Sequence, residues 1–353
     1  MNEAHTAISS IGEFGLIDQI KKITDIRVDD VSIHKNLIEG IGDDAAVFQP
    51  TMGKVQLFTT DALIEGIHFD LTFTSFNHLG WKAMAENFSD IAAMGGVPRY
   101  ATMTIALPKK ISVEMVHQLY AGATSACKQY SCLLVGGDTT ASLGNMMISV
   151  SVIGEADKDR VIYRHGAQPG DLLCVTGHLG CSLAGLKILQ REKNRFINSS
   201  EPKRFEPNLA PYAAAIEKHL MPKPRLDISK LLTEQVKVTS MIDISDGLAS
   251  EVQHLCKKSL ASALVYEHNL PVIGMTQKIA EEFNESPTVY ALYGGEEYEL
   301  LFTISNAEFK KLESLTTDVT IIGRMNNIPG NIELVKENGE SQPLYAGGWN
   351  HFA

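Results

Sequence analysis

The first half of the chain alternates between strand-like and helix-like segments, and this alternation limits the folds that it can adopt. In residues 77–96 the apolar residues recur at helical spacing, and the pattern stops at two glycines before Pro98. Residues 112–130 predict a second helix, and four β-rich runs flank the two helices: 55–61, 99–108, 132–135 and 146–156. This βαβαββ order predicts an α+β or α/β domain.

The second half starts a new series of elements. A chain of 353 residues is too long for one ordinary core, so we expect two domains, 1–157 and 158–353, divided in the polar stretch 155–171. The polar segment 191–211 is interpreted as a surface insertion or a mobile loop. The pattern predicts strands at 172–177, 238–245, 263–268, 298–304 and 320–325, and helices at 182–191, from Leu248 and at 307–315.

Charge and cysteine content narrow the class of protein. Lys plus Arg number 31 against 42 Asp plus Glu, a net charge of −11, which argues against a nucleic-acid or anionic-membrane surface. The five cysteines form no C-x-x-C pair, so we expect reduced thiols in a cytoplasmic protein. The first fifteen residues do not resemble a signal peptide, and no stretch is long and apolar enough for a membrane span.

Two adjacent aspartates stand in the sequence GIGDDAAVF, Gly40 to Phe48, directly before an apolar run that reads as the start of a buried strand. Two unit charges about 4 Å apart repel by about 4 kcal/mol at an effective dielectric of roughly 20. A bound cation is one way to offset this repulsion. Such a cation would need further ligands elsewhere in the sequence.

Aspartates recur beside small residues: Asp43, Asp44, Asp61, Asp90, Asp138, Asp243 and Asp246. Each alone has an ordinary structural interpretation, such as an Asx turn, a strand end or the N-cap that Ser245 or Asp246 would provide. Three of them, Asp61, Asp138 and Asp243, follow apolar runs, so we expect them at the carboxyl ends of strands, where open α/β sheets bind ligands. Oxygen ligands without nearby His or Cys favour Mg²⁺ bound together with substrate phosphates.

The common phosphate-binding signatures are missing. The G-x-G-x-x-A match at Gly40–Ala45 places two anions where a pyrophosphate would lie, and no P-loop or protein-kinase motif is present. If ATP binds, backbone amides around Gly137 and cations such as Arg164 must hold its phosphates, together with several metal ions.

Seven motifs span nearly the whole chain, in the order GIGDDAAVF, TTDALIEGIHF, NFSDIAAMGGVP, GGDTT, IDISDGL, GGEEYELLFT and GGWNHF. In this order they resemble the motifs of the thiamine-monophosphate kinase family, which belongs to the aminoimidazole-ribonucleotide-synthetase-like superfamily. The resemblance implies a two-domain fold, with an N-terminal α/β domain that dimerises through its sheet and a C-terminal α+β domain. It also implies transfer of the ATP γ-phosphoryl group to thiamine monophosphate, the final step of thiamine diphosphate biosynthesis.

The same resemblance assigns roles to residues at matching motif positions. It implies a homodimer that uses several Mg²⁺ ions, with ATP and thiamine monophosphate as substrates. Asp43 would be a metal ligand or would support one. The implied metal ligands are Asp44, Thr59, Thr60, Asp61, Asp90, Asp138, Asp243 and Asp246; the ATP contacts are Tyr130, Gly137, Asp138, Arg164 and Ser245; and the substrate contacts are His68, Glu296 and Trp349.

Two other classes of function stay open at this point. One is another ATP-using relative, such as an amidine-forming purine enzyme or selenophosphate synthetase. The latter would need a reactive cysteine early in the chain, whereas the first cysteine here is Cys127. The other is a cation-binding or scaffold protein without turnover. For the kinase we predict direct in-line transfer without a phosphoenzyme, because an ionised phosphate acceptor needs no strong general base.

Overall fold

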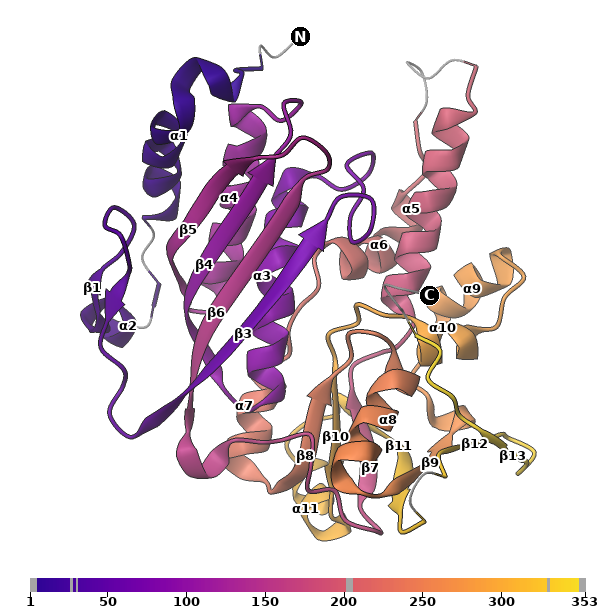
Figure 1. Ribbon diagram of the computed structural model, residues 1–353. Helices are drawn as coiled ribbons and strands as arrows, with labels where there is room; N and C mark the ends of the chain where they lie inside the picture. Colours follow the sequence, from indigo (N-terminus) through magenta and orange to yellow (C-terminus); the bar gives the residue numbers. More distant parts are fainter. Residues whose placement is uncertain (1–4, 26–27, 30, 201–205, 329–330, 349–353) are drawn as a thin grey trace. The chain divides into compact units, whose positions relative to one another are not determined.

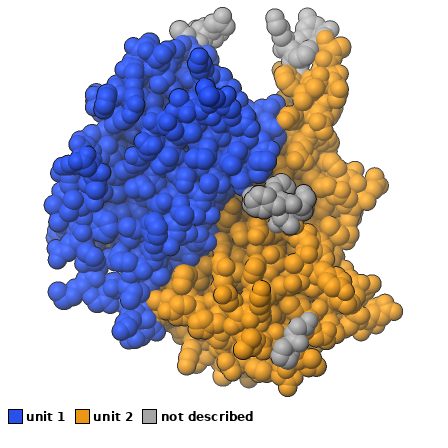
Figure 2. Space-filling model, in the orientation of Figure 1, with its two compact units in different colours: residues 1–91, 96–159 blue, residues 92–95, 160–353 orange. Residues whose placement is uncertain are grey.

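The computed structural model describes residues 5–25, 28–29, 31–200, 206–328 and 331–348. The chain forms two compact units, which Figure 2 shows in different colours. Unit 1 comprises Met1–Ile91 and Gly96–Asp159, and unit 2 comprises Ala92–Gly95 and Arg160–Ala353. The division after residue 157 that we expected for the domains stays a prediction.

A four-stranded sheet forms the centre of unit 1. Its strands lie in the order β3-β6-β4-β5, with β4 and β5 parallel and the other neighbours antiparallel. The chain order β3, α3, β4, α4, β5, β6 confirms the predicted βαβαββ pattern. The bounds are β3 Lys54–Ile64, α3 Phe76–Ala93, β4 Val97–Leu107, α4 Val113–Gln129, β5 Leu133–Ala141 and β6 Met147–Asp157.

Helices α3 and α4 lie on the same side of this sheet (Figure 1). On β3, Leu57 and Leu63 are buried on the covered face, whereas Phe58 between them is 71% exposed. The two helices approach closely at Gly122. A Cβ at this position would lie only 1.9 Å from the backbone oxygen of Asn77. A glycine is required at such a contact, since any side chain would force the helices apart.

The N-terminal part of unit 1 differs from one expectation. It contains α1 (Ile8–Thr24), α2 (Val31–Asn36), β1 (Leu37–Glu39) and β2 (Val47–Phe48). The apolar run after the adjacent aspartates is not a buried strand: β2 pairs only with β1, and Val47 is 47% exposed.

Unit 2 is built on a seven-stranded sheet in the order β13-β12-β9-β11-β7-β10-β8, in which only β12 and β9 pair in parallel. Both faces are covered. On β10, Leu301 belongs to a core that includes α8, whereas Leu300 and Phe302 belong to a second core with α7 and α11. The strands are β7 Leu172–Thr176, β8 Val238–Asp243, β9 Ser262–Tyr266, β10 Leu300–Ile304, β11 Val319–Asn326, β12 Glu333–Val335 and β13 Ser341–Pro343.

The helices of unit 2 include one that corrects the sequence interpretation. Helix α5 continues to Ile197, so the start of the polar segment 191–211 is helical and not a loop; Glu192 is buried there in contact with Arg191 and Arg195. The helices are α5 Cys181–Ile197, α6 Ala213–Leu220, α7 Leu226–Gln235, α8 Leu248–Ser259, α9 Gly274–Glu282, α10 Pro287–Tyr293 and α11 Asn306–Leu312, with short 3₁₀ turns at Lys158–Arg160, Ala210–Tyr212 and Glu267–Asn269.

Two further expectations concern the whole chain. All five cysteines are buried free thiols, as the absence of a C-x-x-C pattern predicted. Among the residues that the structure describes, no helix has the length and apolar character needed to cross a lipid bilayer.

Candidate active site

In unit 1, three predicted metal ligands lie together where β3 faces α3. The Thr59 hydroxyl donates a hydrogen bond to Oδ2 of Asp90. Burial, with the nearby charge of Asp90, raises the pKa of Asp61 to about 6. Two carboxylates and a hydroxyl in a partly desolvated place form an oxygen donor set that suits a hard cation such as Mg²⁺.

The position of Asp61 and Asp138 within their strands differs from our prediction. Asp61 lies inside β3, which ends at Ile64, and Asp138 lies inside β5, which ends at Ala141, so neither is at a strand end. The runs TTD and GGDTT continue the sheet because their backbone groups pair with β6 and β4. Asp243 is the last residue of β8, as predicted.

Asp61 and Asp138 are also on opposite edges of the same sheet. The register runs from Asp61 to Val150 on β6, to Met103 on β4 and to Gly137 on β5, the neighbour of Asp138. Three strand spacings separate the two backbones by about 14 Å. Two carboxylates on one Mg²⁺ must come within about 4 Å of each other, so these two side chains of one chain do not reach a common ion.

The other predicted ligands of unit 1 are more exposed. The Thr60 hydroxyl donates to the Val150 backbone oxygen at 3.0 Å and accepts from the Ser151 hydroxyl at 3.0 Å. Asp44 lies in an exposed turn, where its backbone N–H donates to Oδ1 of Asp43 at 2.8 Å. This contact joins adjacent residues, so it is not an Asx turn, in which the side chain bonds to the backbone two residues on; the Asp44 residue is exposed.

The predicted ATP and substrate residues of unit 1 are held by local contacts. His68 accepts a hydrogen bond at Nδ1 from the Ile64 backbone N–H at 3.0 Å. Tyr130 follows the last turn of α4 and packs against Trp81 and Phe88, with ring centroids 6.1 and 5.7 Å away. A Cβ at Gly137 would lie 2.1 Å from the Met103 backbone oxygen, so glycine is required there.

In unit 2, residues 243–247, which we call the aspartate loop, join β8 to α8. Glu251, one turn into α8, accepts hydrogen bonds at Oε1 from the Asp246 backbone N–H at 3.1 Å and the Ser245 hydroxyl at 3.4 Å. Burial, with the charges of Asp246 and Asp243 as smaller causes, raises the pKa of Glu251 to about 8. The N-cap of α8 is Gly247, at φ +120°, so the N-cap interpretation of Ser245 and Asp246 is wrong.

Residues 294–299, the glutamate loop, pack on the aspartate loop through backbone hydrogen bonds. Glu296 N donates to Ser245 O at 2.7 Å, and Tyr298 N donates to Ile244 O at 2.8 Å. Glu296 and Tyr298 have left-handed φ values of 61° and 51°, which cost about 1–2 kcal/mol each for a residue with a Cβ. The surrounding contacts must therefore outweigh this strain.

The C-terminal GGWNHF motif reaches the same place. A Cβ at Gly348 would lie 2.0 Å from the Asp246 backbone oxygen, which means that the chain passes directly over the aspartate loop. Three motifs far apart in sequence thus meet in unit 2. Trp349 lies outside the described residues.

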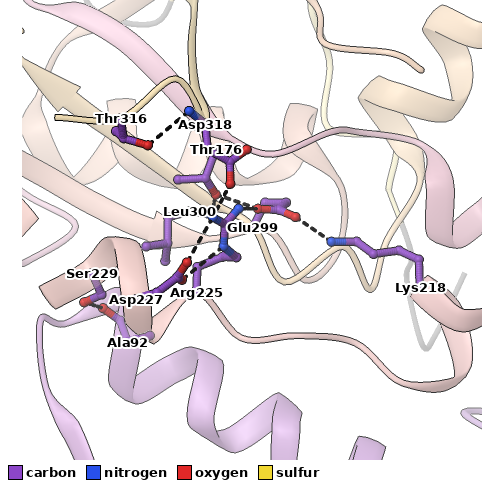
Figure 3. A network of polar contacts seen from close by, with 10 residues as sticks. All are labelled: Ala92, Thr176, Lys218, Arg225, Asp227, Ser229, Glu299, Leu300, Thr316 and Asp318. Atoms are coloured by element: carbon purple, nitrogen blue, oxygen red, sulfur yellow. Dashed lines mark hydrogen bonds and ion pairs between the residues drawn. The ribbon is translucent and has the colours of Figure 1, made fainter. Parts of the chain in front are cut away.

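The glutamate loop is anchored by a buried ionic network that the sequence analysis did not find (Figure 3). Glu299 binds Lys218 Nζ at 2.5 Å and Arg225 at 2.7 Å, and it accepts from the Thr176 hydroxyl at 2.6 Å. Burial opposes ionisation of Glu299, but Lys218 and Arg225 outweigh it and hold the pKa of the carboxyl below its usual value. The signal available in the sequence was a glutamate directly before the apolar run LLFTI, since such a charge needs a partner.

Glu297 corrects another interpretation. A carboxylate in a loop such as this is usually solvated, but Glu297 is fully buried. Its Oε1 accepts from the Ser182 backbone N–H at 3.0 Å, and burial raises its pKa to about 7. Arg164, a predicted ATP contact, is exposed, and its backbone oxygen accepts from the Ser259 hydroxyl at 3.4 Å.

The described part of the chain contains no group of three or more His, Cys, Asp or Glu side chains arranged to hold a metal ion. Within each unit, some of the metal ligands inferred from the resemblance lie near one another. Thr59, Asp61 and Asp90 lie together in unit 1, and Asp243 and Asp246 belong to one loop in unit 2.

Two family models match the chain. "AIR synthase related protein, N-terminal domain" matches residues 42–156, and "AIR synthase related protein, C-terminal domain" matches residues 168–333. Together they include nearly all of the predicted site.

Curated relatives and solved structures agree with these matches. Thiamine-monophosphate kinase of Bacillus subtilis is 34% identical over 345 residues, 96% of this chain and 99% of that protein. The enzyme of Aquifex aeolicus is 35% identical, over 98% of this chain and 99% of that protein. A solved structure of AaThiL complexed with AMPPCP and TMP has a TM-score of 0.74 and 34% identity, covering 99% of this chain and 100% of that chain.

A more distant set of structures shares only the fold. Hydrogenase maturation protein HypE in complex with ATP has a TM-score of 0.71 at 19% identity. The near full-length identity above 30% separates the kinases from this group. The chain belongs to the thiamine-monophosphate kinase family, within the AIR synthase related proteins.

Proposed function

We propose that this protein phosphorylates thiamine monophosphate with ATP, giving thiamine diphosphate and ADP, the final step of thiamine diphosphate biosynthesis. The observation that carries the proposal is the 34% identity over 99% of the chain to AaThiL, which was solved with AMPPCP and TMP. An oxygen of the acceptor phosphate forms a bond to the γ-phosphorus as the bond from that phosphorus to ADP breaks. No phosphoenzyme is formed, because the acceptor attacks directly.

Mg²⁺ is part of the proposal. Donor and acceptor are both polyanions, and bound Mg²⁺ would lower their mutual repulsion and stabilise the charge of the transferring group. The raised pKa of Asp61 beside Asp90 supports a cation there, since a metal removes the repulsion between the two carboxylates. The proposed ligands are Asp44, Thr59, Thr60, Asp61, Asp90, Asp138, Asp243 and Asp246.

Two of the proposed nucleotide contacts are held by close neighbours. Gly137 allows the backbone to pass close to its neighbour strand, and the Ser245 hydroxyl is held by Glu251. Tyr130 would place its ring, and Arg164 its guanidinium, on the nucleotide. Rigid placement matters because phosphoryl transfer depends chiefly on positioning and on charge.

The proposed contacts for thiamine monophosphate are His68, Glu296 and Trp349. Thiamine carries a cationic thiazolium ring, which is attracted to an aromatic face and to a carboxylate. Glu296 is suited to this role because 27% of its side chain is exposed while its backbone is fixed on the aspartate loop.

We also propose a homodimer formed through the sheet of unit 1. The face of the sheet opposite α3 and α4 carries exposed apolar side chains, including Phe58 at 71% and Ile64 at 39%. If β5 of each subunit lies beside β3 of its partner, so that both edges pair, the open faces of the two sheets are enclosed and Asp138 of one chain comes near Asp61 of the other. This arrangement resolves the separation of the two residues within one chain. The buried free cysteines are consistent with the proposed cytoplasmic location.

The test is ADP release from Mg-ATP with and without thiamine monophosphate. Thiamine and aminoimidazole precursors serve as control acceptors. ADP that depends on thiamine monophosphate supports the kinase, whereas its absence would overturn the assignment. Trapping of ³²P on the protein from γ-labelled ATP would contradict direct transfer.

A further inference from the structure

His219 is a buried histidine on α6 that contacts the glutamate loop. It is 4% exposed, and its Nδ1 lies 3.2 Å from Oε2 of Glu296. The Ser182 hydroxyl, in the first turn of α5, lies 3.2 Å from the same nitrogen. A carboxylate only accepts hydrogen bonds, so the tautomer with its proton on Nδ1 is the one in which His219 would donate to Glu296.

This group contains serine, histidine and glutamate, but it is not a nucleophilic triad. In such a triad one ring nitrogen faces the serine and the other faces the carboxylate. Here the hydroxyl and the carboxylate share Nδ1, and Ser182 is 0% exposed, so no substrate atom reaches its oxygen. The contacts of His219 therefore serve to hold a side chain in place.

Each of the three glutamates in the glutamate loop is contacted by a residue of α5 or α6. Lys218 and His219 are adjacent on α6, and they hold Glu299 and Glu296 respectively. Ser182 holds Glu297 through its backbone N–H and His219 through its hydroxyl. The left-handed backbone at Glu296 is thus supported by a contact at its own side chain as well as by the contacts of its neighbours.

Only part of Glu296 is enclosed by these contacts. Oε2 lies 3.2 Å from His219 Nδ1, and 27% of the Glu296 side chain is exposed. A carboxylate that is already oriented loses less side-chain freedom when a ligand binds, and this preorganisation strengthens binding without changing the reacting atoms.

We propose that His219, supported by Ser182, is a positioning residue that orients the Glu296 carboxylate toward the cationic part of thiamine monophosphate. The inference rests on the proposed function, because Glu296 contacts that substrate only if the kinase assignment is right. It makes α6 a determinant of acceptor affinity. ATP binding and the chemical step do not depend on it.

The experiment compares His219→Leu and His219→Asn with the parent protein. Leucine removes the donor, whereas the asparagine amide supplies an N–H near the former position of Nδ1. We expect His219→Leu to raise the KM for thiamine monophosphate about tenfold, with the KM for ATP and kcat within about twofold of the parent. His219→Asn should recover most of the affinity. The exposed His254 on α8 gives the matched control, His254→Leu, which should change none of the three constants.

Thermal unfolding is measured on every variant, since a purely structural role would lower Tm without separating the two KM values. Equal changes in both KM values, or an unchanged KM for thiamine monophosphate in His219→Leu, would overturn the inference. If His219→Leu does not fold, Ser182→Ala and His219→Asn are compared with the parent protein. Ser182→Ala should raise the KM for thiamine monophosphate and leave the KM for ATP unchanged. An unchanged KM for thiamine monophosphate in Ser182→Ala would count against the proposal. If the parent protein shows no ADP release that depends on thiamine monophosphate, the proposed function fails first, and this inference fails with it.

Discussion

Asp61 and Asp138 lie on the two opposite edge strands of one four-stranded sheet, in neighbouring rows of paired residues. Both residues stand at motif positions that the family resemblance assigns to metal ligands. Within one chain, however, their backbones are about 14 Å apart across the sheet. If both edges of the sheet paired with a second copy of the chain, β3 with the partner's β5 and β5 with the partner's β3, one residue of each kind would come together twice. The first prediction follows from this relationship.

Asp61→Asn and Asp138→Asn should each reduce kcat at least about a hundredfold, because each removes a carboxylate from the proposed metal site. Mixing the two inactive proteins after subunit exchange should restore activity. Each mixed dimer keeps one intact site, so a random equimolar mixture should reach about one quarter of the parent activity. Steady-state ADP release measures this. A mixture as inactive as its components would show that the residues act within one chain.

Asp61 also predicts how Mg²⁺ binding depends on pH. Burial and the neighbouring Asp90 raise its pKa in the folded protein to about 6, from 3.8. The folded state therefore binds the Asp61 proton more tightly than the unfolded state does, and in the absence of metal this residue makes stability fall as pH rises from about 4 to about 6. Because Mg²⁺ binds the ionised form, its effect on Tm should be larger near pH 8 than near pH 5.5.

Differential scanning fluorimetry with and without Mg²⁺ tests this prediction. In Asp61→Asn, the Mg²⁺-induced shifts in Tm at the two pH values should differ less than in the parent, since the titrating group is gone. Other buried carboxylates, such as Glu251 with a pKa of about 8, titrate equally in both proteins and cancel in the comparison. An Mg²⁺ shift of the same size at both pH values in the parent would contradict the prediction.

The buried ion pair of Arg225 and Glu299 should be essential for the stability of unit 2. Arg225→Met leaves the Glu299 carboxylate with one fewer cation in a place that is 4% exposed. We expect a loss of about 3–5 kcal/mol in the free energy of unfolding, measured with urea. The exposed pair Lys223–Glu217 gives a control, because Lys223→Met should cost no more than about 1 kcal/mol. Equal losses for both variants would contradict this account.

The crossing of α3 and α4 gives a prediction about packing alone. Alanine at Gly122 would place its Cβ 1.9 Å from the Asn77 backbone oxygen, so the helices must separate. We expect Gly122→Ala to destabilise the protein by about 1–3 kcal/mol, although alanine by itself favours a helix over glycine. At Gly144 a Cβ meets nothing within 4 Å, so Gly144→Ala should leave Tm nearly unchanged. A stable Gly122→Ala protein would show that the contact can relax.

Several elements could be predicted from the sequence because their signals are local. The 3.6-residue spacing in α3 and α4 and the apolar runs of β7 and β10 depend only on residues near one another in the chain. The predictions failed where long-range pairing decides the outcome. The segments TTD and GGDTT contain polar residues that usually end a strand, but pairing with β6 and β4 extends both strands through them.

The candidate site divides in the same way. The order of the acidic motifs, their oxygen ligands and their family resemblance can be read from the sequence, because they depend on residue type and spacing. The residues that contact these ligands in the folded protein cannot be read from it. The contact between His219 and Glu296, the network around Glu299 and the placement of Asp61 and Asp138 on opposite edges come from strand order and helix packing, which join segments far apart in the chain. Residue type determined the chemistry that this protein can perform, and only the tertiary structure decided which of those groups meet, because contacts between distant segments depend on how the whole chain is paired and packed.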